Sequence, residues 1–317
     1  MKRYLVTGGA GFIGSHLIES LLKQDNRVVN LDNFDGFYAR AIKERNISEA
    51  LKSPNYKLIE GSINDISKFQ TKIGQIDVIV HLAAKAGVRP SIDKANEFFN
   101  TNVNGTIEIL EYARRNKIGK VIYASSSSVY GVNTNIPWSV DDKDLKPISP
   151  YAASKVASEN SCYVYSKLYD IEITALRFFT VFGPRQRPDL AIHKFVKSVI
   201  NNDEIILFGT GNTSRDYTYV DDIVKGIEGA IRYQGYEKFN VFNLGNCTTV
   251  TLSELVEMIE KITKKKAIKV FKNEQPGDVP LTCANIDKST KMLGYVPSTN
   301  LSQGIENFVQ WFKKKNH

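Results

Sequence analysis

The sequence predicts an α/β protein built on a doubly wound parallel sheet, with a smaller C-terminal α/β region for substrate binding. Three observations predict this fold class. In the first half of the chain, short apolar runs alternate with longer amphipathic segments; a glycine-rich turn follows the first apolar run; and the pattern changes after about residue 177. Strands that alternate with helices form a parallel sheet covered by helices on both faces.

The apolar runs predict six buried strands in the first half of the chain. The segment 12–24 is predicted to be a helix, because its apolar residues recur at helical spacing and form one stripe. Further helices are expected over 95–117 and from about Tyr151 onward. The predicted strands span 3–7, 27–31, 56–60, 77–83, 120–125 and 171–178.

The second half has a different character. Loops that contain Pro, Gly and Arg follow residue 177, a helix is expected over 251–264, and no repeat or flexible linker separates the halves. We therefore predict a nucleotide-binding domain over 1–177 and a mainly substrate-binding region over 178–317. A strand and a helix near 218–248 are expected to return to the first domain.

Composition limits the classes of function. The 317 residues carry three widely spaced cysteines and four histidines without a CxxC pair, so we expect neither a disulfide framework nor a metal site. The N-terminal segment does not resemble a signal peptide, and no apolar run is long enough to cross a bilayer, so we expect a cytoplasmic protein without a membrane partner.

The net charge of +8 admits two interpretations. The densest basic runs, 264–266 and 313–315, lack the interleaved aromatic side chains of a nucleic-acid surface. They are typical of solvated lysine faces, so we expect no nucleic-acid partner. A basic site for an anionic small molecule remains open.

The turn "VTGGAGFIG" predicts a dinucleotide site. Gly8, Gly11 and Gly14 lie between a predicted strand and a predicted helix, where glycines let the backbone approach a pyrophosphate. Asp32, at the end of the next strand, is placed to accept hydrogen bonds from the adenosine ribose and to repel a 2′-phosphate. This favours NAD over NADP, although Asp32 also suits a turn, and Arg40 and Lys43 downstream keep NADP open.

The stretch "SPYAASK" contains a tyrosine and a lysine four residues apart at the start of a helix. Tyr151 and Lys155 would then lie on one face. We expect the ammonium to lower the phenol pKa, which is about 10 when unperturbed, and so to create a base that works near neutral pH.

Together these motifs resemble the extended short-chain dehydrogenase/reductase family, whose nucleotide-binding domain is Rossmann-type. The resemblance rests on "TGGAGFIG", "HLAA", "SSSSVYG", "YAASK" and "RDYTYVDD" and covers nearly the whole chain. It implies a bound NAD, with Tyr151 as acid/base, Lys155 as the tuning cation and Ser126 as the hydroxyl partner. The implied cofactor-binding residues are Gly8, Gly11, Phe12, Ile13, Gly14, Asp32, Asn33, Ser62, Ile63, Leu82, Ala83, Ala84, Asn102, Tyr151 and Lys155.

The loop after Ser126 distinguishes reactions within this family. Relatives that dehydrate or decarboxylate sugar nucleotides carry an acid there, whereas this chain has Ser127 and Ser128. Elimination needs a second acid/base, so the loop favours epimerisation through a 4-keto intermediate. The stretch 177–195 is most similar to UDP-glucuronate 4-epimerases, which convert UDP-glucuronate to UDP-galacturonate.

The same resemblance implies a set of substrate contacts. Hydroxyl groups of Ser127, Ser128 and Thr180 and the guanidinium of Arg185 are expected to hold a substrate carboxylate. Arg185 also suits a surface role, Phe208 suits core packing, and Arg89 suits a helix cap. The implied substrate-binding residues are Arg89, Ser127, Ser128, Thr180, Val181, Arg185, Phe208 (on uracil), Arg215 (on the diphosphate) and Asp278 (on the uridine ribose).

Some features depart from the family pattern or leave alternatives. Ser62 stands where an Asp usually fixes adenine, and Thr210 stands where Asp is common. A UDP-glucose 4-epimerase is the main alternative, followed by a UDP-glucuronate decarboxylase and by a non-catalytic NAD-binding regulator. Relatives commonly form homodimers through helices that correspond to 95–117 and 151–168, so we expect a homodimer that binds a UDP-sugar.

Overall fold

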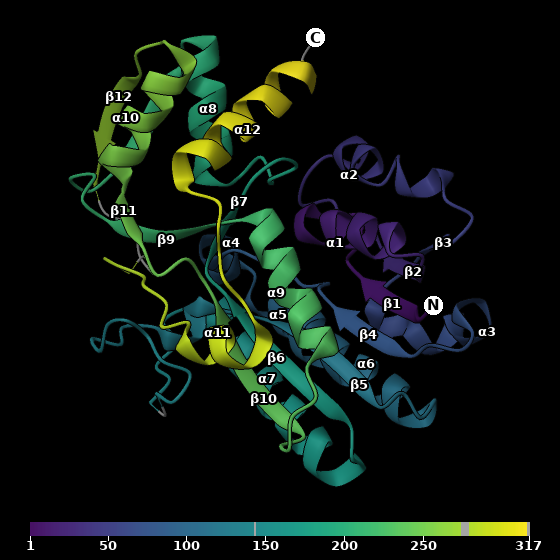
Figure 1. Ribbon diagram of the computed structural model, residues 1–317. Coiled ribbons are helices and arrows are strands. Elements are labelled where there is room, and N and C mark those ends of the chain that lie inside the picture. The colour runs from purple at the N-terminus through teal and green to yellow at the C-terminus, as the bar shows by residue number, and fades with distance from the viewer. Residues whose placement is uncertain (143, 274–278, 316–317) are drawn as a thin grey trace.

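The computed structural model of the protein describes residues 1–142, 144–273 and 279–315 (Figure 1). A seven-stranded sheet forms its centre, and every pair of neighbouring strands in it is parallel. This confirms the predicted fold class. In spatial order the strands are β10 (Phe239–Leu244), β6 (Glu172–Phe178), β5 (Lys120–Ser126), β4 (Val78–His81), β1 (Arg3–Thr7), β2 (Arg27–Asp32) and β3 (Tyr56–Glu60).

Helices cover both faces of this sheet, as its strand composition requires. Helices α1 (Phe12–Lys23) and α9 (Val220–Arg232) pack together on one face, and α9 crosses in front of the sheet in Figure 1. Helices α6 (Gly105–Arg115) and α7 (Pro150–Tyr169) pack together in a second hydrophobic core, with Leu110 and Cys162 fully buried. Buried apolar side chains on both faces explain why the strands read as continuous apolar runs.

The order of the strands creates a switch point beside β1. The chain fills the β1–β2–β3 side first and then crosses to β4, which pairs with the other edge of β1. Loops from β1 and β4 therefore diverge at the carboxyl ends of the strands and leave a crevice, the usual ligand position in such sheets.

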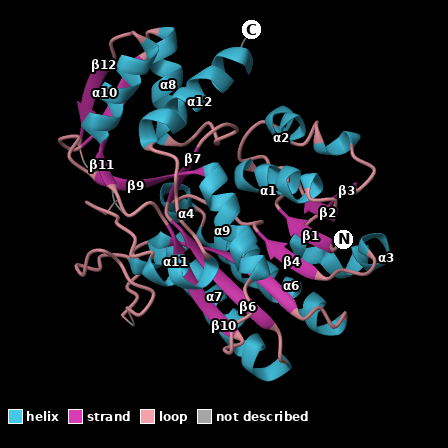
Figure 2. Cartoon of the chain, in the orientation of Figure 1, coloured by secondary structure: helices cyan, strands magenta, loops and turns pink. Residues whose placement is uncertain are grey.

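A smaller region caps this carboxyl edge (Figure 2). It contains a three-stranded sheet, a two-stranded parallel sheet and three helices that pack with them. Its elements are β7 (Thr180–Phe182), β9 (Ser214–Tyr219) and β11 (Thr249–Thr251), then β8 (Glu204–Phe208) and β12 (Ile268–Lys272), then α8 (Ala191–Asn201), α10 (Leu252–Thr263) and α12 (Leu301–Lys315). Helix α11 (Asp287–Leu293) packs instead on β10 and α9 of the main unit.

Short helical segments complete the connections. Among the described residues they are α2 (Arg40–Asn46), α3 (Gln70–Ile73), α4 (Val88–Asp93) and the 3₁₀ turns η1 (Ala50–Lys52), η2 (Ile63–Phe69) and η4 (Ser127–Tyr130). Within this part of the chain, no helix has the length and apolar character needed to cross a membrane.

The helix predicted over 95–117 is present over 95–115, but a π-helical turn interrupts its α-helical hydrogen bonding. The segment consists of α5 (Ala95–Phe99), a π-helical turn η3 (Asn100–Asn104) and α6. The π turn carries the buried Asn102, whose amide bonds the backbone N–H and C=O of Lys85 at 2.8 and 3.0 Å and the Ser154 hydroxyl at 2.9 Å. These bonds account for the interruption, because they fix the loop after β4 to α7, and π turns recur at functional positions.

His81, the last residue of β4, extends this buried network. Thr106 donates its hydroxyl proton to the Asn102 carbonyl, so it accepts from His81 Nε2, 3.1 Å away. Nδ1 of the same ring then accepts from the Thr7 hydroxyl at 2.7 Å, while Thr7 accepts from the Ala83 N–H. This proton order requires a neutral imidazole, and burial lowers the pKa of His81 to about 3.

The fold should therefore lose stability in mild acid. The folded-state pKa of His81 lies below the unfolded value of 6.5, so its contribution is complete above 6.5 and is lost as pH falls toward 3. We expect the Tm to decrease between pH 7 and pH 4. His81→Asn should be less stable at pH 7 and show a shallower pH dependence in thermal unfolding monitored by circular dichroism. An equal slope in both proteins would contradict this assignment.

Candidate active site

A cavity of about 810 Å³ lies at the carboxyl edge of the main sheet, between that sheet and the smaller region. Ligand sites in proteins commonly have this volume. Of the residues predicted from the sequence, the following line it: Gly8, Gly11, Phe12, Ile13, Gly14, Asp32, Asn33, Ser62, Ile63, Leu82, Ala83, Ala84, Ser126, Ser127, Ser128, Tyr151, Lys155, Thr180, Val181 and Arg215.

The glycine turn forms a cradle that larger residues would fill. Gly8 has a φ of +72°, and a Cβ there would lie 2.8 Å from the backbone of Ala83. At Gly14 a Cβ would lie 2.5 Å from the Gly8 carbonyl oxygen. Gly11, the N-cap of α1, provides no side-chain cap, so the first-turn N–H groups face the cavity end of the helix. This arrangement fits a dinucleotide pyrophosphate.

The carboxylate of Asp32 is fixed at the end of β2. Its two oxygens accept the backbone N–H groups of Ala10 and Phe34, each at 2.9 Å. Asp32 is buried and lines the cavity, so its remaining lone pairs suit ribose hydroxyls. Arg40, which kept NADP open, is instead held by Glu60 and Glu44 through contacts of 2.7 Å.

Ser62 occupies the position where relatives carry an acid. Its hydroxyl accepts the N–H of Asn64 at 3.2 Å and caps the first turn of η2. Ser62 still lines the cavity, so the substitution preserves the turn without providing a carboxylate.

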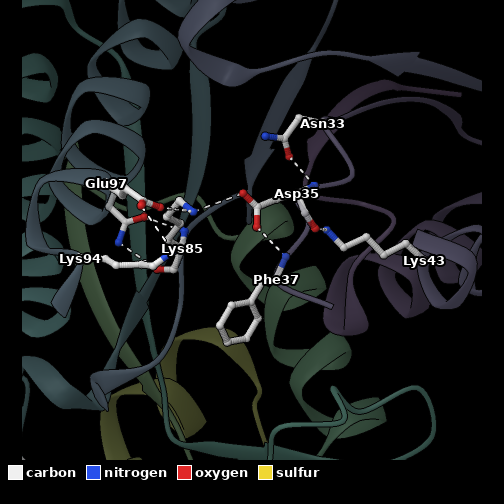
Figure 3. A network of polar contacts seen from close by, with 8 residues as sticks. Asn33, Asp35, Phe37, Lys43, Lys85, Lys94 and Glu97 are labelled. Carbon is white, nitrogen blue, oxygen red and sulfur yellow. Dashed lines mark hydrogen bonds and ion pairs between the residues drawn. The ribbon is translucent and has the colours of Figure 1, made fainter. Parts of the chain in front are cut away.

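The loop that follows β2 lines one side of the cavity. Figure 3 shows the polar contacts around this loop. Asp35 is its centre: Oδ1 accepts the N–H of Phe37 at 3.0 Å, and Oδ2 lies 3.3 Å from the Lys85 ammonium. Lys85 also reaches Glu97 at 3.0 Å, and the Lys43 ammonium donates to the Asp35 carbonyl at 2.8 Å. The loop after β2 is thereby joined to the loop after β4 and to α5.

Helix α7 presents Tyr151 and Lys155 at its first turns. The Ser149 hydroxyl caps the helix by accepting the Ala152 N–H at 3.1 Å, and Pro150 occupies the first helical position. The Lys155 ammonium donates to the Ala124 carbonyl of β5 at 2.8 Å, and burial lowers its pKa to about 8.

The prediction that Lys155 lowers the pKa of Tyr151 was wrong. Burial raises the pKa of Tyr151, while a hydrogen bond with Ser126 and the charge of Arg187 lower it; Lys155 is not among these contributors. The ammonium is bonded to the Ala124 carbonyl, and desolvation of the phenol outweighs the two effects that lower its pKa.

Ser126 ends β5 beside these groups. Its hydroxyl oxygen accepts the N–H of Ser128 at 3.2 Å and the Ser128 hydroxyl at 2.9 Å. The three consecutive serines at 126–128 therefore bring several hydroxyl groups to one wall of the cavity.

A buried ion pair joins the elements that carry Tyr151 and Ser126. Glu159 of α7 accepts Nε and Nη2 of Arg177 at 3.0 and 2.8 Å, and it also accepts the hydroxyl of Ser125. Because these three residues belong to α7, β6 and β5, the pair fixes the helix that carries Tyr151 against the strand that carries Ser126. Loss of one partner of such a buried pair typically costs about 3–5 kcal/mol.

The prediction that Arg185 faces the substrate requires correction. Arg185 has a φ of +66° and pairs with Glu19 of α1 at 2.5 Å, and it does not line the cavity. Arg187 lines the cavity instead, and its charge acts on Tyr151. Sequence reasoning missed Arg187, although "GPRQRPD" contains it, because spacing in a loop does not specify which side chain faces inward.

Three further predicted residues within the described part of the chain, Arg89, Asn102 and Phe208, do not line the cavity. Arg89 and Phe208 contact each other, with the guanidinium 4.6 Å from the ring centre, so Phe208 is not presented to the cavity. Asn102 lies outside the cavity lining and forms hydrogen bonds with Lys85 and Ser154. Asp278 lies outside the described residues.

We predict that Gly14→Ala will reduce the NAD bound per protein chain at least tenfold, because its Cβ would collide with backbone atoms of the cradle. Gly119→Ala is the matched control, since no atom lies within 4 Å of its new Cβ. NAD released by acid from each purified protein gives the measurement. Equal NAD content in both variants would contradict the role of the cradle.

Comparison with known proteins agrees with this geometry. The NAD dependent epimerase/dehydratase family matches residues 4–245. An uncharacterised protein of Methanocaldococcus jannaschii is 44% identical over 98% of this chain and 96% of its own length. UDP-glucuronate 4-epimerase 4 of Arabidopsis thaliana is 39% identical over 97% of this chain and 74% of its own length.

A solved structure extends the likeness to the fold. The crystal structure of UDP-glucuronic acid 4-epimerase from Bacillus cereus, in complex with UDP-glucuronic acid and NAD, superposes with a TM-score of 0.93. The two chains share 37% identity, and each is covered to 99%. The chain therefore belongs to the NAD dependent epimerase/dehydratase family.

Proposed function

We propose that the protein is a UDP-glucuronate 4-epimerase that forms UDP-galacturonate and uses a resident NAD. The observation that carries the proposal is the juxtaposition of two sets of groups in one cavity. One set consists of Ser126, Tyr151 and Lys155. The other set can donate hydrogen bonds to a substrate carboxylate, and it consists of Ser127, Ser128, Thr180 and Arg187. The similarity to UDP-glucuronate 4-epimerases supports the same assignment.

The side chains suit reversible oxidation at C4 of the sugar. Bound NAD would supply the hydride acceptor and donor. Tyr151 takes the proton of the 4-hydroxyl in the forward half-reaction. It returns a proton to that oxygen after the 4-keto sugar has rotated in the cavity to present its opposite face. Ser126, bonded to Tyr151, donates to the same substrate oxygen and stabilises the charge that develops there. Lys155, fixed to the Ala124 carbonyl, contributes a cation beside the cofactor ribose.

The intermediate imposes a requirement on the carboxylate contacts. A 4-keto uronate is a β-keto acid and loses carbon dioxide when its C5–carboxyl bond stands perpendicular to the carbonyl plane. Hydroxyl groups on one wall and a guanidinium on another can hold that bond near the ring plane. Ser127, Ser128 and Thr180 supply the hydroxyl groups, and Arg187 supplies the guanidinium in place of Arg185.

Arg215 and Asp278 belong to the other end of the proposed substrate. Arg215 lines the cavity, where its planar fork suits diphosphate oxygens. Asp278 and Phe208 remain predicted contacts for the uridine ribose and uracil; for Phe208 the contact would require Arg89 to leave its ring. A cytoplasmic location also remains a prediction of the sequence.

The first experiment is incubation of the purified protein with UDP-glucuronate without added NAD, followed by separation of the products. We expect UDP-galacturonate without release of carbon dioxide. A UDP-pentose would indicate decarboxylation. Turnover of UDP-glucose alone would assign the protein to the main alternative.

The two neighbouring arginines provide a matched pair of variants. Arg187→Ala should raise the KM for UDP-glucuronate at least tenfold, because a charge-assisted contact with the carboxylate is worth about 1.5–3 kcal/mol. Arg185→Ala should change that KM less than threefold, because Arg185 pairs with Glu19 outside the cavity. Steady-state kinetics of both variants give the comparison, and the reverse ranking would contradict the assignment.

We also propose a homodimer formed through α7 and its neighbours. On the first of the two helices expected at the interface, Leu110 is fully buried and belongs to the core. Val164 and Leu168, one turn apart on α7, are 47% and 66% exposed, and the exposed Tyr163 and Tyr169 lie beside them in sequence. Such an apolar helix face suits a second copy of the chain.

Light scattering should therefore give the mass of a dimer, and Leu168→Asp should shift it toward that of a monomer. The charge would have to be buried without a partner in the dimer but remains solvated in the monomer. A monomeric wild-type protein would overturn the homodimer proposal.

A further inference from the structure

We propose that Phe37 is a positioning residue for Arg187, and that the Asp35–Lys85 ion pair holds Phe37 in that place. The inference rests on the proposed function, because it assigns to Arg187 the binding of the substrate carboxylate. It adds a link between the loop that lines the cofactor side of the cavity and the group that selects the substrate.

The first step is that Arg187 is not fixed by its own ion pair. Nε and Nη2 donate to the two oxygens of Asp189 at 2.9 and 2.7 Å, so one edge of the guanidinium is fully used. Asp189, however, lies only two residues away in the same loop. The pair therefore moves as a unit with that loop, and it orients the fork without fixing its position relative to the sheet.

The second step is that contacts from other loops also reach Arg187. Nη2 lies 3.5 Å from the Ala86 carbonyl, at the limit of a hydrogen bond. The guanidinium carbon lies 5.1 Å from the centre of the Phe37 ring, within the range of a cation–π interaction. The Phe37 ring thus offers this cation a broad surface from another loop.

The third step is that Phe37 is itself held. Its N–H donates to Asp35 Oδ1, while Asp35 Oδ2 faces Lys85, which Glu97 of α5 anchors from the other side (Figure 3). The ring is 44% exposed, so burial alone does not fix it. A continuous set of contacts consequently runs from α5 through Lys85, Asp35 and Phe37 to Arg187.

This arrangement explains why a large apolar side chain stands half exposed at the cavity. The ring presents its negative face to the guanidinium. Removal of the ring should leave the charge of Arg187 intact but allow its position to vary. The effect should then fall on the uronate, whose carboxylate meets Arg187, and spare UDP-glucose, which lacks a carboxylate.

The test compares wild type, Phe37→Leu, Phe37→Tyr, Asp35→Asn and the double variant Asp35→Asn/Phe37→Leu in the NAD-loaded protein. The measurements are KM and kcat for UDP-glucuronate and the inhibition constant of UDP-glucose. Tyr236→Leu is the control, because Tyr236 is a fully exposed aromatic residue before β10, at the opposite end of the strands.

We expect Phe37→Leu to raise the KM for UDP-glucuronate about two- to fivefold, as loss of a half-exposed cation–π contact would. The inhibition constant of UDP-glucose should stay unchanged, and Phe37→Tyr should restore the wild-type KM. Asp35→Asn should raise the KM in the same direction. The KM of the double variant should be no higher than that of the more impaired single variant, because both substitutions break the same series of contacts.

Three results would overturn the inference. Phe37→Leu could leave the KM unchanged while Arg187→Ala raises it. The KM and the inhibition constant of UDP-glucose could rise equally, which would mean that Phe37 shapes the whole cavity. A wild-type protein that does not turn over UDP-glucuronate would remove the proposed function and this inference with it, whereas the first two results leave the proposed function standing.

Discussion

The functional groups meet because the seven central strands run parallel. A parallel sheet places the carboxyl ends of all its strands at one edge, so the segments after β1, β2, β4, β5 and β6 open into the same cavity. The switch of direction beside β1 separates the segments after β1 and β4 and makes room there. Residues as distant in sequence as Gly8 and Arg215 thereby line one space. No single motif has to supply the whole site.

Buried polar contacts convert this topology into a fixed geometry. Two networks lie behind the cavity: one joins Thr7, His81 and Asn102 to the loop after β4, and the other joins Ser125, Glu159 and Arg177 beneath the catalytic groups. Both consist of groups that are costly to bury without partners, so each network is stable only when its elements keep their relative positions. The requirement for satisfied buried groups therefore adds a constraint on the geometry of the site to that of hydrophobic packing.

The sequence was sufficient for features that depend on local constraint. A turn that needs Gly8 at positive φ and Gly14 without a side chain can only be built from such residues, and the spacing of Tyr151 and Lys155 is fixed by the helix. The sequence was insufficient for features that tertiary contacts determine, such as the direction in which a loop side chain points. The left-handed conformation of Arg185 directs that side chain to Glu19 and leaves Arg187 to face inward, and the π turn at Asn102 follows from its bonds to Lys85.

The electrostatics of Tyr151 also depend on tertiary structure. Burial raises the pKa of the phenol, and both Ser126 and Arg187 oppose that effect. In the proposed complex the substrate carboxylate would neutralise much of the charge of Arg187, which Asp189 already reduces. The Arg187 contribution to the phenolate would then diminish as the site fills. Ser126 has one hydroxyl proton, so in the proposed complex it would donate to the substrate oxygen in place of Tyr151. Under the proposed function, both residues would therefore act on the bound substrate more than on the pKa of Tyr151.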